Sequence, residues 1–171
     1  MSGYPSVDRD REISEFRIEK ARTDGTLLLS TGAFIPGSFF VAGSSATHPG
    51  PETVKELLDA ERGFFPFEVR RPNGEKQTTL YNRDHVIYVE LVGNEEAQLD
   101  PGYDVATRRT VSMLCATGVR LKGMVRVYRP QGRDRLSDFA RSAEQFRYLE
   151  TLDVTYLVNV RHLIELVEEI P

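Results

Sequence analysis

The feature that most constrains this chain is an internal repeat, in which apolar runs and turn residues recur in the same order. A recurring order of landmarks is typical of one structural unit used twice. Differences in length fall in loops, chiefly in a longer hairpin around Pro72-Asn73-Gly74 of the first half. Three pairs of segments align: LLLSTGAFIPGSFFV (27–41) with MLCATGVRLKGMVRV (113–127), FFPFE (64–68) with FRYLE (146–150), and TLYNRDHVIYVEL (79–91) with YLVNVRHLIELVE (156–168).

Each half has the same predicted content of short strands and one helix. An apolar run reaches a Thr-Gly turn, and a second run with an internal glycine follows, which is typical of two strands joined by a tight turn. Val54, Leu57 and Leu58 share one face of a predicted helix at 53–62, as do Leu136 and Phe139 in the second half. Short strands then follow, at 64–70 and 76–82 in the first half, and at 146–151 and 154–159 in the second.

The repeat sets the predicted domain organisation. We predict a mainly β (α+β) fold of two small-barrel repeats, each with one inserted helix, related by a pseudo-twofold axis. The boundaries are an N-terminal arm at 1–21, a first repeat at 22–92, a linker at 93–105 and a second repeat at 106–171.

One histidine begins the last predicted strand of each repeat. His85 follows a turn that Asn82 opens, and His162 follows a turn that Asn159 opens. Alternate residues of a strand share a face, so His85 would begin one core-facing row, with Ile87 and Val89. In the second repeat the same row is His162, Ile164 and Leu166. We interpret both histidines as structural. The alternative, a metal or proton-transfer role, requires further ligands, because zinc usually takes three or four N, S or O donors.

The order of elements resembles the Sm-like small β-barrel. TVSMLCATGVRLKGMVRV (110–127) is similar to the first Sm motif, and TYLVNVRHLIELVE (155–168) is similar to the second, with Asn159–Arg161 in place of its Arg-Gly turn. The helix stands between the second and third strands instead of preceding the barrel. The stretch YRPQGRDRLSDF (128–139) also resembles a family of small bacterial proteins of unknown function. The resemblance implies tandem small barrels.

A basic stretch at 120–141 is the most unusual part of the sequence. Basic residues with interleaved aromatics are typical of surfaces that bind phosphate or nucleic acid. The alternative is that the arginines form ion pairs with Asp134, Asp138 and the acidic C-terminus, since the guanidinium fork suits such pairs. The candidate residues for nucleic-acid or anion binding are Lys122, Arg126, Tyr128, Arg129, Arg133 and Arg135.

A predicted outer strand face in the first repeat carries Phe34, Pro36, Ser38 and Phe40. Contiguous exposed apolar surface on a protein usually marks a contact. We therefore predict a homodimer in which Phe34, Pro36 and Phe40 lie at the interface. The alternative is that the helix or the other repeat of the same chain covers these phenylalanines.

Composition and motifs narrow the classes of function. The formal net charge of -4 gives no overall attraction to nucleic acid or to an anionic membrane, and no run approaches the roughly 20 apolar residues of a membrane span. Cys115 is the only cysteine, which favours the cytoplasm and leaves no cysteine-based metal site. No GxSxG, GxGxxG or Walker-type motif is present. We predict a non-enzymatic binding or assembly module of a bacterial cytoplasm, with no cofactor and no metal. An RNA- or anion-binding regulator is the alternative, and an enzyme is the third hypothesis.

Overall fold

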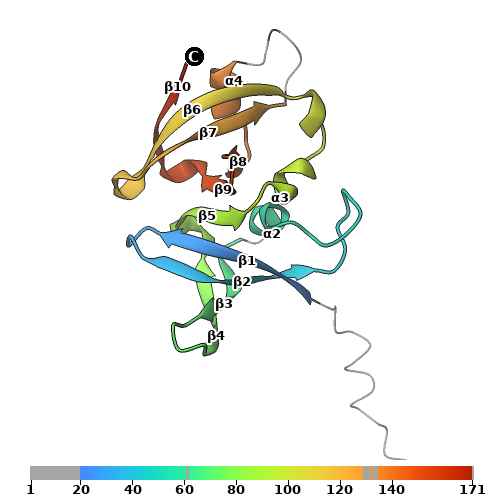
Figure 1. Ribbon diagram of the computed structural model, residues 1–171, viewed down its shortest axis with the longest axis vertical. Helices are drawn as coiled ribbons and strands as arrows, with labels where there is room; N and C mark the ends of the chain where they lie inside the picture. The colour runs from blue at the N-terminus through green and yellow to red at the C-terminus, as the bar shows by residue number, and fades with distance from the viewer. Residues whose placement is uncertain (1–19, 61, 129–131, 133–134, 171) are drawn as a thin grey trace, which may run out of the picture.

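The computed structural model shows a mainly β protein (Figure 1). It describes residues 20–60, 62–128, 132 and 135–170. Strands predominate in these ranges, so the predicted mainly β class is confirmed. Within the same ranges no helix is long and apolar enough to cross a membrane.

The elements follow the predicted order closely. Strands β3, β4 and β9 coincide with the predicted segments, β8 ends one residue earlier, and β1 begins at Lys20, inside the predicted arm. The strands are β1 (Lys20–Leu29), β2 (Phe34–Ala42), β3 (Phe64–Arg70), β4 (Lys76–Asn82), β5 (Val86–Val92), β6 (Thr107–Cys115), β7 (Arg120–Val127), β8 (Phe146–Glu150), β9 (Val154–Asn159) and β10 (Leu163–Glu168). The helices are α2 (Val54–Ala60), α3 (Glu95–Gln98) and α4 (Leu136–Ala140), and short 3-10 turns are η1 (Arg83–His85), η2 (Tyr103–Val105), η3 (Ala116–Gly118) and η4 (Val160–His162).

The described strands form one antiparallel sheet in the order β10-β6-β7-β8-β9-β5-β1-β2-β3-β4. The first five strands of the chain and the last five are therefore contiguous in the sheet, and β5 and β9 join them. In Figure 1, β6, β7, β10 and α4 lie at the top, β1 to β4 lie at the bottom, and β5, α2 and α3 lie between them.

Strand registers in the two halves agree with the alignment of the sequence segments. A register shift occurs beside Leu29 where β1 meets β5, and another occurs beside Leu163 where β10 meets β6. Corresponding pairs of opposed residues are Leu27–Ile35 and Met113–Leu121, Phe64–Asn82 and Phe146–Asn159, and Leu28–Tyr88 and Leu114–Glu165.

Gly37 and Gly123 lie at aligned positions where two strands approach each other closely. A Cβ added to Gly123 would lie 2.5 Å from the carbonyl oxygen of Glu150, and one added to Gly37 would overlap the carbonyl oxygen of Glu68. Only glycine leaves space for these backbones, so the internal glycine of each second strand fixes how the third strand passes.

Two hydrophobic clusters form the core, and each contains residues from both predicted repeats. The first includes Phe39 and Phe65 of the first half together with Phe146 of β8. The second includes Leu28 and Ile87 together with most of the apolar residues of β6 and β7. Strand β5 is buried on both faces and contributes to both clusters. The two halves therefore share their cores.

The predicted core-facing rows that begin with the histidines are wrong in part. His85 ends the 3-10 turn η1 and is exposed, whereas Val86 begins β5 and is buried. In the second half, the register shift turns Ile164 outward, where it is 68% exposed. The reason is local. Each turn adds a 3-10 residue and a bulge, which reset the alternation that a simple strand would have kept.

Candidate functional site

Arg126, which we predicted as a candidate for nucleic-acid or anion binding, is buried. Its Nε donates a hydrogen bond to a carboxylate oxygen of Glu150 at 2.9 Å, and its Nη1 donates to the carbonyl oxygen of Tyr103 at 3.1 Å. The guanidinium carbon lies 3.5 Å from the centre of the Tyr103 ring, and the Tyr103 hydroxyl also donates to Glu150. The predicted linker at 93–105 thus folds over β7, and Glu150 neutralises the charge of Arg126.

Other basic residues of β6 and β7 face acidic residues at the end of the chain. These ion pairs are largely exposed, and such pairs contribute only about 0–1 kcal/mol each to stability. The nitrogen–oxygen distances are 3.2 Å for Arg109–Glu168, 3.1 Å for Arg120–Glu165 and 3.1 Å for Lys122–Glu169. This geometry matches the alternative in which the basic residues pair with the acidic C-terminus.

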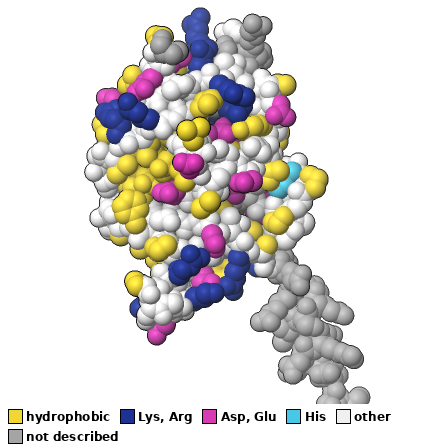
Figure 2. Space-filling model, in the orientation of Figure 1, with side chains coloured by type: hydrophobic (Ala, Val, Ile, Leu, Met, Phe, Trp, Pro, Cys, Tyr) yellow, Lys and Arg dark blue, Asp and Glu magenta, His cyan; other side chains and the backbone are white. Residues whose placement is uncertain are grey.

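The remaining candidates for anion binding lie near the end of β7. Tyr128 is 38% exposed, and burial together with the nearby Asp100 carboxylate raises the pKa of its hydroxyl. Arg135 is exposed and precedes α4, and Arg129 and Arg133 lie outside the described residues. Basic side chains are interspersed with acidic ones on the face that Figure 2 shows. The anion-binding role of these residues stays a prediction.

The predicted interface face of β2 is partly covered by β1. Phe34 is 57% exposed and Pro36 is exposed, but Phe40 is half-buried, with the Arg22 guanidinium carbon 5.0 Å from the centre of its ring. Ser38, which we expected to face outward, is buried and donates a hydrogen bond to Asp24 at 2.7 Å. The apolar surface there is thus smaller than predicted, and its role as an interface stays a prediction.

The two predicted structural histidines make different contacts. His162 donates from Nε2 to the carbonyl oxygen of Asp84 at 2.6 Å, so a histidine of the second half is bound to a turn of the first. His85 places Nδ1 2.9 Å from the hydroxyl oxygen of Ser30. The first contact joins η4 to η1, and the second joins η1 to the turn after β1.

Asn82 and Asn159 open the two 3-10 turns as predicted. The Asn82 side-chain oxygen accepts the backbone N–H of Asp84 at 3.0 Å, and the Asn159 side-chain oxygen accepts that of Arg161 at 3.1 Å. Asn159 is fully buried, and its amide also donates to the carbonyl oxygen of Val86 at 2.9 Å. One asparagine therefore shapes its own turn and joins β9 to the start of β5.

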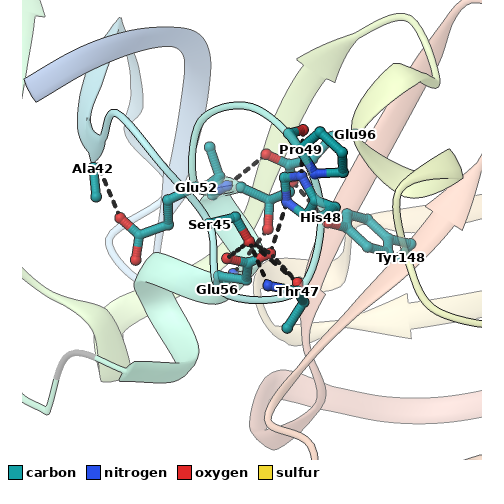
Figure 3. A network of polar contacts seen from close by, with 11 residues as sticks. Ala42, Ser45, Thr47, His48, Pro49, Glu52, Glu56, Glu96 and Tyr148 are labelled. Atoms are coloured by element: carbon teal, nitrogen blue, oxygen red, sulfur yellow. Dashed lines mark hydrogen bonds and ion pairs between the residues drawn. The ribbon is translucent and has the colours of Figure 1, made fainter.

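A polar loop between β2 and α2 was not predicted as a site. His48 places Nε2 2.9 Å from a Glu56 oxygen and Nδ1 3.0 Å from the Pro49 carbonyl oxygen. The Ser45 and Thr47 hydroxyls donate to the same Glu56 carboxylate (Figure 3). These contacts raise the pKa of His48, first through the Pro49 carbonyl and also through the Glu56 charge, although burial opposes them. No sequence pattern links His48 to Glu56 across Pro-Gly-Pro.

Beside this loop, Glu96 is held between the two halves. It accepts hydrogen bonds from the backbone N–H of Val54 and, at 2.8 Å, from the Tyr148 hydroxyl (Figure 3). Burial raises the pKa of Glu96, and these hydrogen bonds oppose that rise. Glu96 also borders a cleft of about 440 Å³, lined by Arg22, Thr23, Asp24, Pro51, Glu52, Thr53, Leu91, Val92, Glu95, Glu96 and Leu99.

The two ends of the sheet carry exposed apolar side chains. Among the described strands, β4 pairs only with β3, and β10 pairs only with β6. Leu80 of β4 is 62% exposed, and Phe64 on the adjacent β3 is 61% exposed. On β10, Ile164 and Val167 are exposed as well. Strand edges with unpaired backbone groups and apolar side chains are prone to pair with another chain.

Within the described part of the chain, no three His, Cys, Asp or Glu side chains are placed to hold a metal ion. Comparisons with protein-family models, with curated protein sequences and with solved structures found no significant match.

Proposed function

We propose that this protein is a non-enzymatic assembly module of a bacterial cytoplasm, whose copies associate with one another. It is built from two tandem Sm-like small-barrel repeats. The observation that carries the proposal is the pair of exposed, apolar strand edges at β4 and β10.

The tandem-repeat part of the proposal is supported by the strand registers. Aligned residues oppose aligned partners in corresponding strand pairs, and the register shifts occur at aligned positions. Gly37 and Gly123 allow the same close approach of the third strand. Two unrelated domains would share neither the bulge nor the glycine.

The assembly part is supported by apolar residues that are exposed in the described part of the chain. Leu80, Phe64, Ile164 and Phe34 are each more than half exposed. Side chains of this kind in contiguous patches usually mark protein contacts. The anion-binding alternative has less support, because Arg126 and Lys122 are paired with carboxylates.

Light scattering on the purified protein tests the proposal. We expect a mass of at least two copies at tens of micromolar, falling towards the monomer mass of 19.4 kDa only on strong dilution. We expect this association because burying the exposed apolar side chains of one copy against another is favourable. A monomer mass at all concentrations up to several hundred micromolar would contradict the assembly function.

A further inference from the structure

We propose that the cleft beside β1 binds an extended, basic peptide segment of a partner protein, which adds its backbone to the free edge of β1. Addition of a strand to an unpaired sheet edge is a recurring mode of peptide recognition. Strand β1 lies inside the sheet, away from the end strands β4 and β10. This peptide site is therefore separate from the proposed contacts between copies and adds a different kind of partner.

The two strands at the cleft pair with each other over only part of their length. Strand β1 pairs with β2 from Lys20 to Leu28, but with β5 only from Thr26 to Leu29 (Figure 1). None of the described strands pairs with the other edge of β1 between Lys20 and Gly25, and none of these residues is buried. Strand β1 therefore has a free edge inside the sheet, and the cleft lies beside it.

The backbone groups of this free edge face the cleft. Thr26 lies opposite Pro36, and a proline, which has no N–H, is accommodated in a non-hydrogen-bonded pair of a ladder. Such pairs recur at every second residue of antiparallel strands, and this register has no shift, so Asp24 and Arg22 occupy equivalent positions. Their N–H and C=O groups point away from β2, where the backbone of an incoming strand can bond them.

The walls of the cleft combine carboxylates with apolar side chains. Glu52 and Glu95 pair with none of the Lys, Arg and His side chains that the structure describes. The Glu95 carboxylate lies against Gly93, directly after β5, where an added Cβ would overlap it. Leu91 and Leu99 supply apolar surface in the same cleft. A side chain with a long apolar stem and a charged end matches both kinds of wall.

The charge of the cleft selects a basic peptide. Of the described residues that line it, Arg22 alone is basic, and its guanidinium lies 2.7 Å from a Glu68 oxygen and 5.0 Å from the centre of the Phe40 ring. The charge of Arg22 is thus neutralised over β2 and β3. The cleft keeps an excess of negative charge, which a lysine or arginine of the peptide would balance.

The size of the cleft suits a short stretch of extended chain. Its volume of about 440 Å³ lies within the roughly 300–1,000 Å³ of sites for small ligands, so it accommodates a few residues and not a folded domain. The chain's own segment 1–19 does not match the charge of the cleft. Acidic residues outnumber basic ones there: Asp8, Asp10, Glu12, Glu15 and Glu19 against Arg9, Arg11 and Arg17.

Fluorescence anisotropy with a labelled peptide tests the site on the full chain. The probe is acetyl-Thr-Lys-Val-Lys-Val-Thr-amide with a fluorophore at one end, and two matched peptides accompany it. In the first, glutamate replaces both lysines, which removes the charge match. In the second, the side chains are kept and the backbone nitrogens are methylated, which removes the N–H groups that would pair with β1.

We expect the lysine peptide to bind, and to bind more weakly as salt screens the carboxylates. The other two peptides should bind at least tenfold more weakly, because a bond to the β1 edge or the charge match is lost. Glu95→Gln should lower the affinity for the lysine peptide about two- to fivefold, the range that one exposed ion pair supplies. Val92→Lys, at a lining position that is 87% exposed, should also lower it.

Glu75→Gln is the matched control, because it removes an exposed carboxylate from the turn between β3 and β4, outside the cleft. Its affinity for the lysine peptide should equal that of the wild type, and thermal unfolding of the three variants should stay within a few degrees of it. An equal loss in Glu75→Gln and Glu95→Gln would overturn the site, since it would show only a general attraction of charge.

No binding of the lysine peptide up to millimolar concentration would also overturn the site, as would equal affinity for the methylated peptide. Binding that strengthens as the protein is diluted and its oligomers dissociate would assign the cleft to a second copy instead. The mass of the protein without peptide tests the assembly function separately, so failure of the peptide site leaves that function standing.

Discussion

Both ring nitrogens of His48 lie within hydrogen-bond distance of oxygen atoms that can only accept hydrogen bonds. Only the doubly protonated imidazolium can donate to the Pro49 carbonyl and to the Glu56 carboxylate together. Its side chain is 7% exposed, so solvent replaces neither contact. The Glu56 carboxylate also accepts hydrogen bonds from the Ser45 and Thr47 hydroxyls. The charge of Glu56 therefore holds the shape of the loop before α2.

This charge predicts a pH dependence of stability. The folded protein raises the pKa of His48 above its usual 6.5, so the stabilisation is complete below pH 6.5 and is lost as the pH rises through the folded pKa. We expect the wild type to lose stability in chemical denaturation as the pH rises from 6 to 9. His48→Gln, which cannot titrate, should show a flatter profile over that window.

The matched control is His85→Gln, which removes an imidazole outside the loop. The difference between the two variants isolates the contribution of His48. Equal pH profiles for the wild type and His48→Gln would mean that the neutral imidazole holds the loop equally well.

At the scale of elements, the strands are positioned by a few residues that allow unusual approaches. Thr53 accepts the backbone N–H of Glu56 at 3.1 Å and begins α2 in the manner of an N-cap. Gly37 and Gly123 let β3 and β8 cross their neighbours closely, and the bulges beside β5 and β10 shift the faces of those strands.

We expect Gly37→Ala and Gly123→Ala to destabilise the protein, because each Cβ meets a backbone carbonyl that cannot turn away. Overpacking of this kind typically costs about 1–3 kcal/mol. Denaturant unfolding measures the change. Gly25→Ala is the control in the same strand pair, since its Cβ would meet the Phe39 ring at 3.1 Å, and a smaller loss is expected there. Equal losses in all three variants would argue against a specific role of the close crossings.

At the scale of the whole molecule, the two halves share one sheet and two mixed cores. Basic and acidic side chains are interspersed on the face that Figure 2 shows. Within the described part of the basic stretch, Arg126 forms a buried ion pair with Glu150, and Arg120 and Lys122 form exposed pairs with Glu165 and Glu169. The junction of β5 and β9 buries the side chains whose counterparts remain exposed at the ends of the sheet.

This distribution of charge leads to a prediction about nucleic acid. We expect no retardation of a labelled single-stranded RNA in a gel-shift series at low salt, because Lys122 and Arg126 already face carboxylates. Binding that weakens steeply with salt and is reduced in Lys122→Ala/Arg135→Ala would instead support the anion-binding alternative. Lys20→Ala, on the opposite half, is the control for a general loss of positive charge.

The sequence by itself determined most local structure. Apolar alternation located the strands, Asn82 and Asn159 marked their turns, and the aligned Gly37 and Gly123 marked the second strand of each half. These features depend on the backbone preferences of neighbouring residues, and short-range patterns carry that information.

Only the tertiary structure decided how the halves meet. Nothing local indicates that β9 pairs with β5, that Tyr103 covers Arg126, or that Glu56 lies against His48. Such contacts join residues far apart or across a loop, and their energies depend on burial, which periodicity does not specify. The exposure of His85 has the same origin, because the 3-10 turn η1 holds His85 outside the strand whose inner row we expected it to begin.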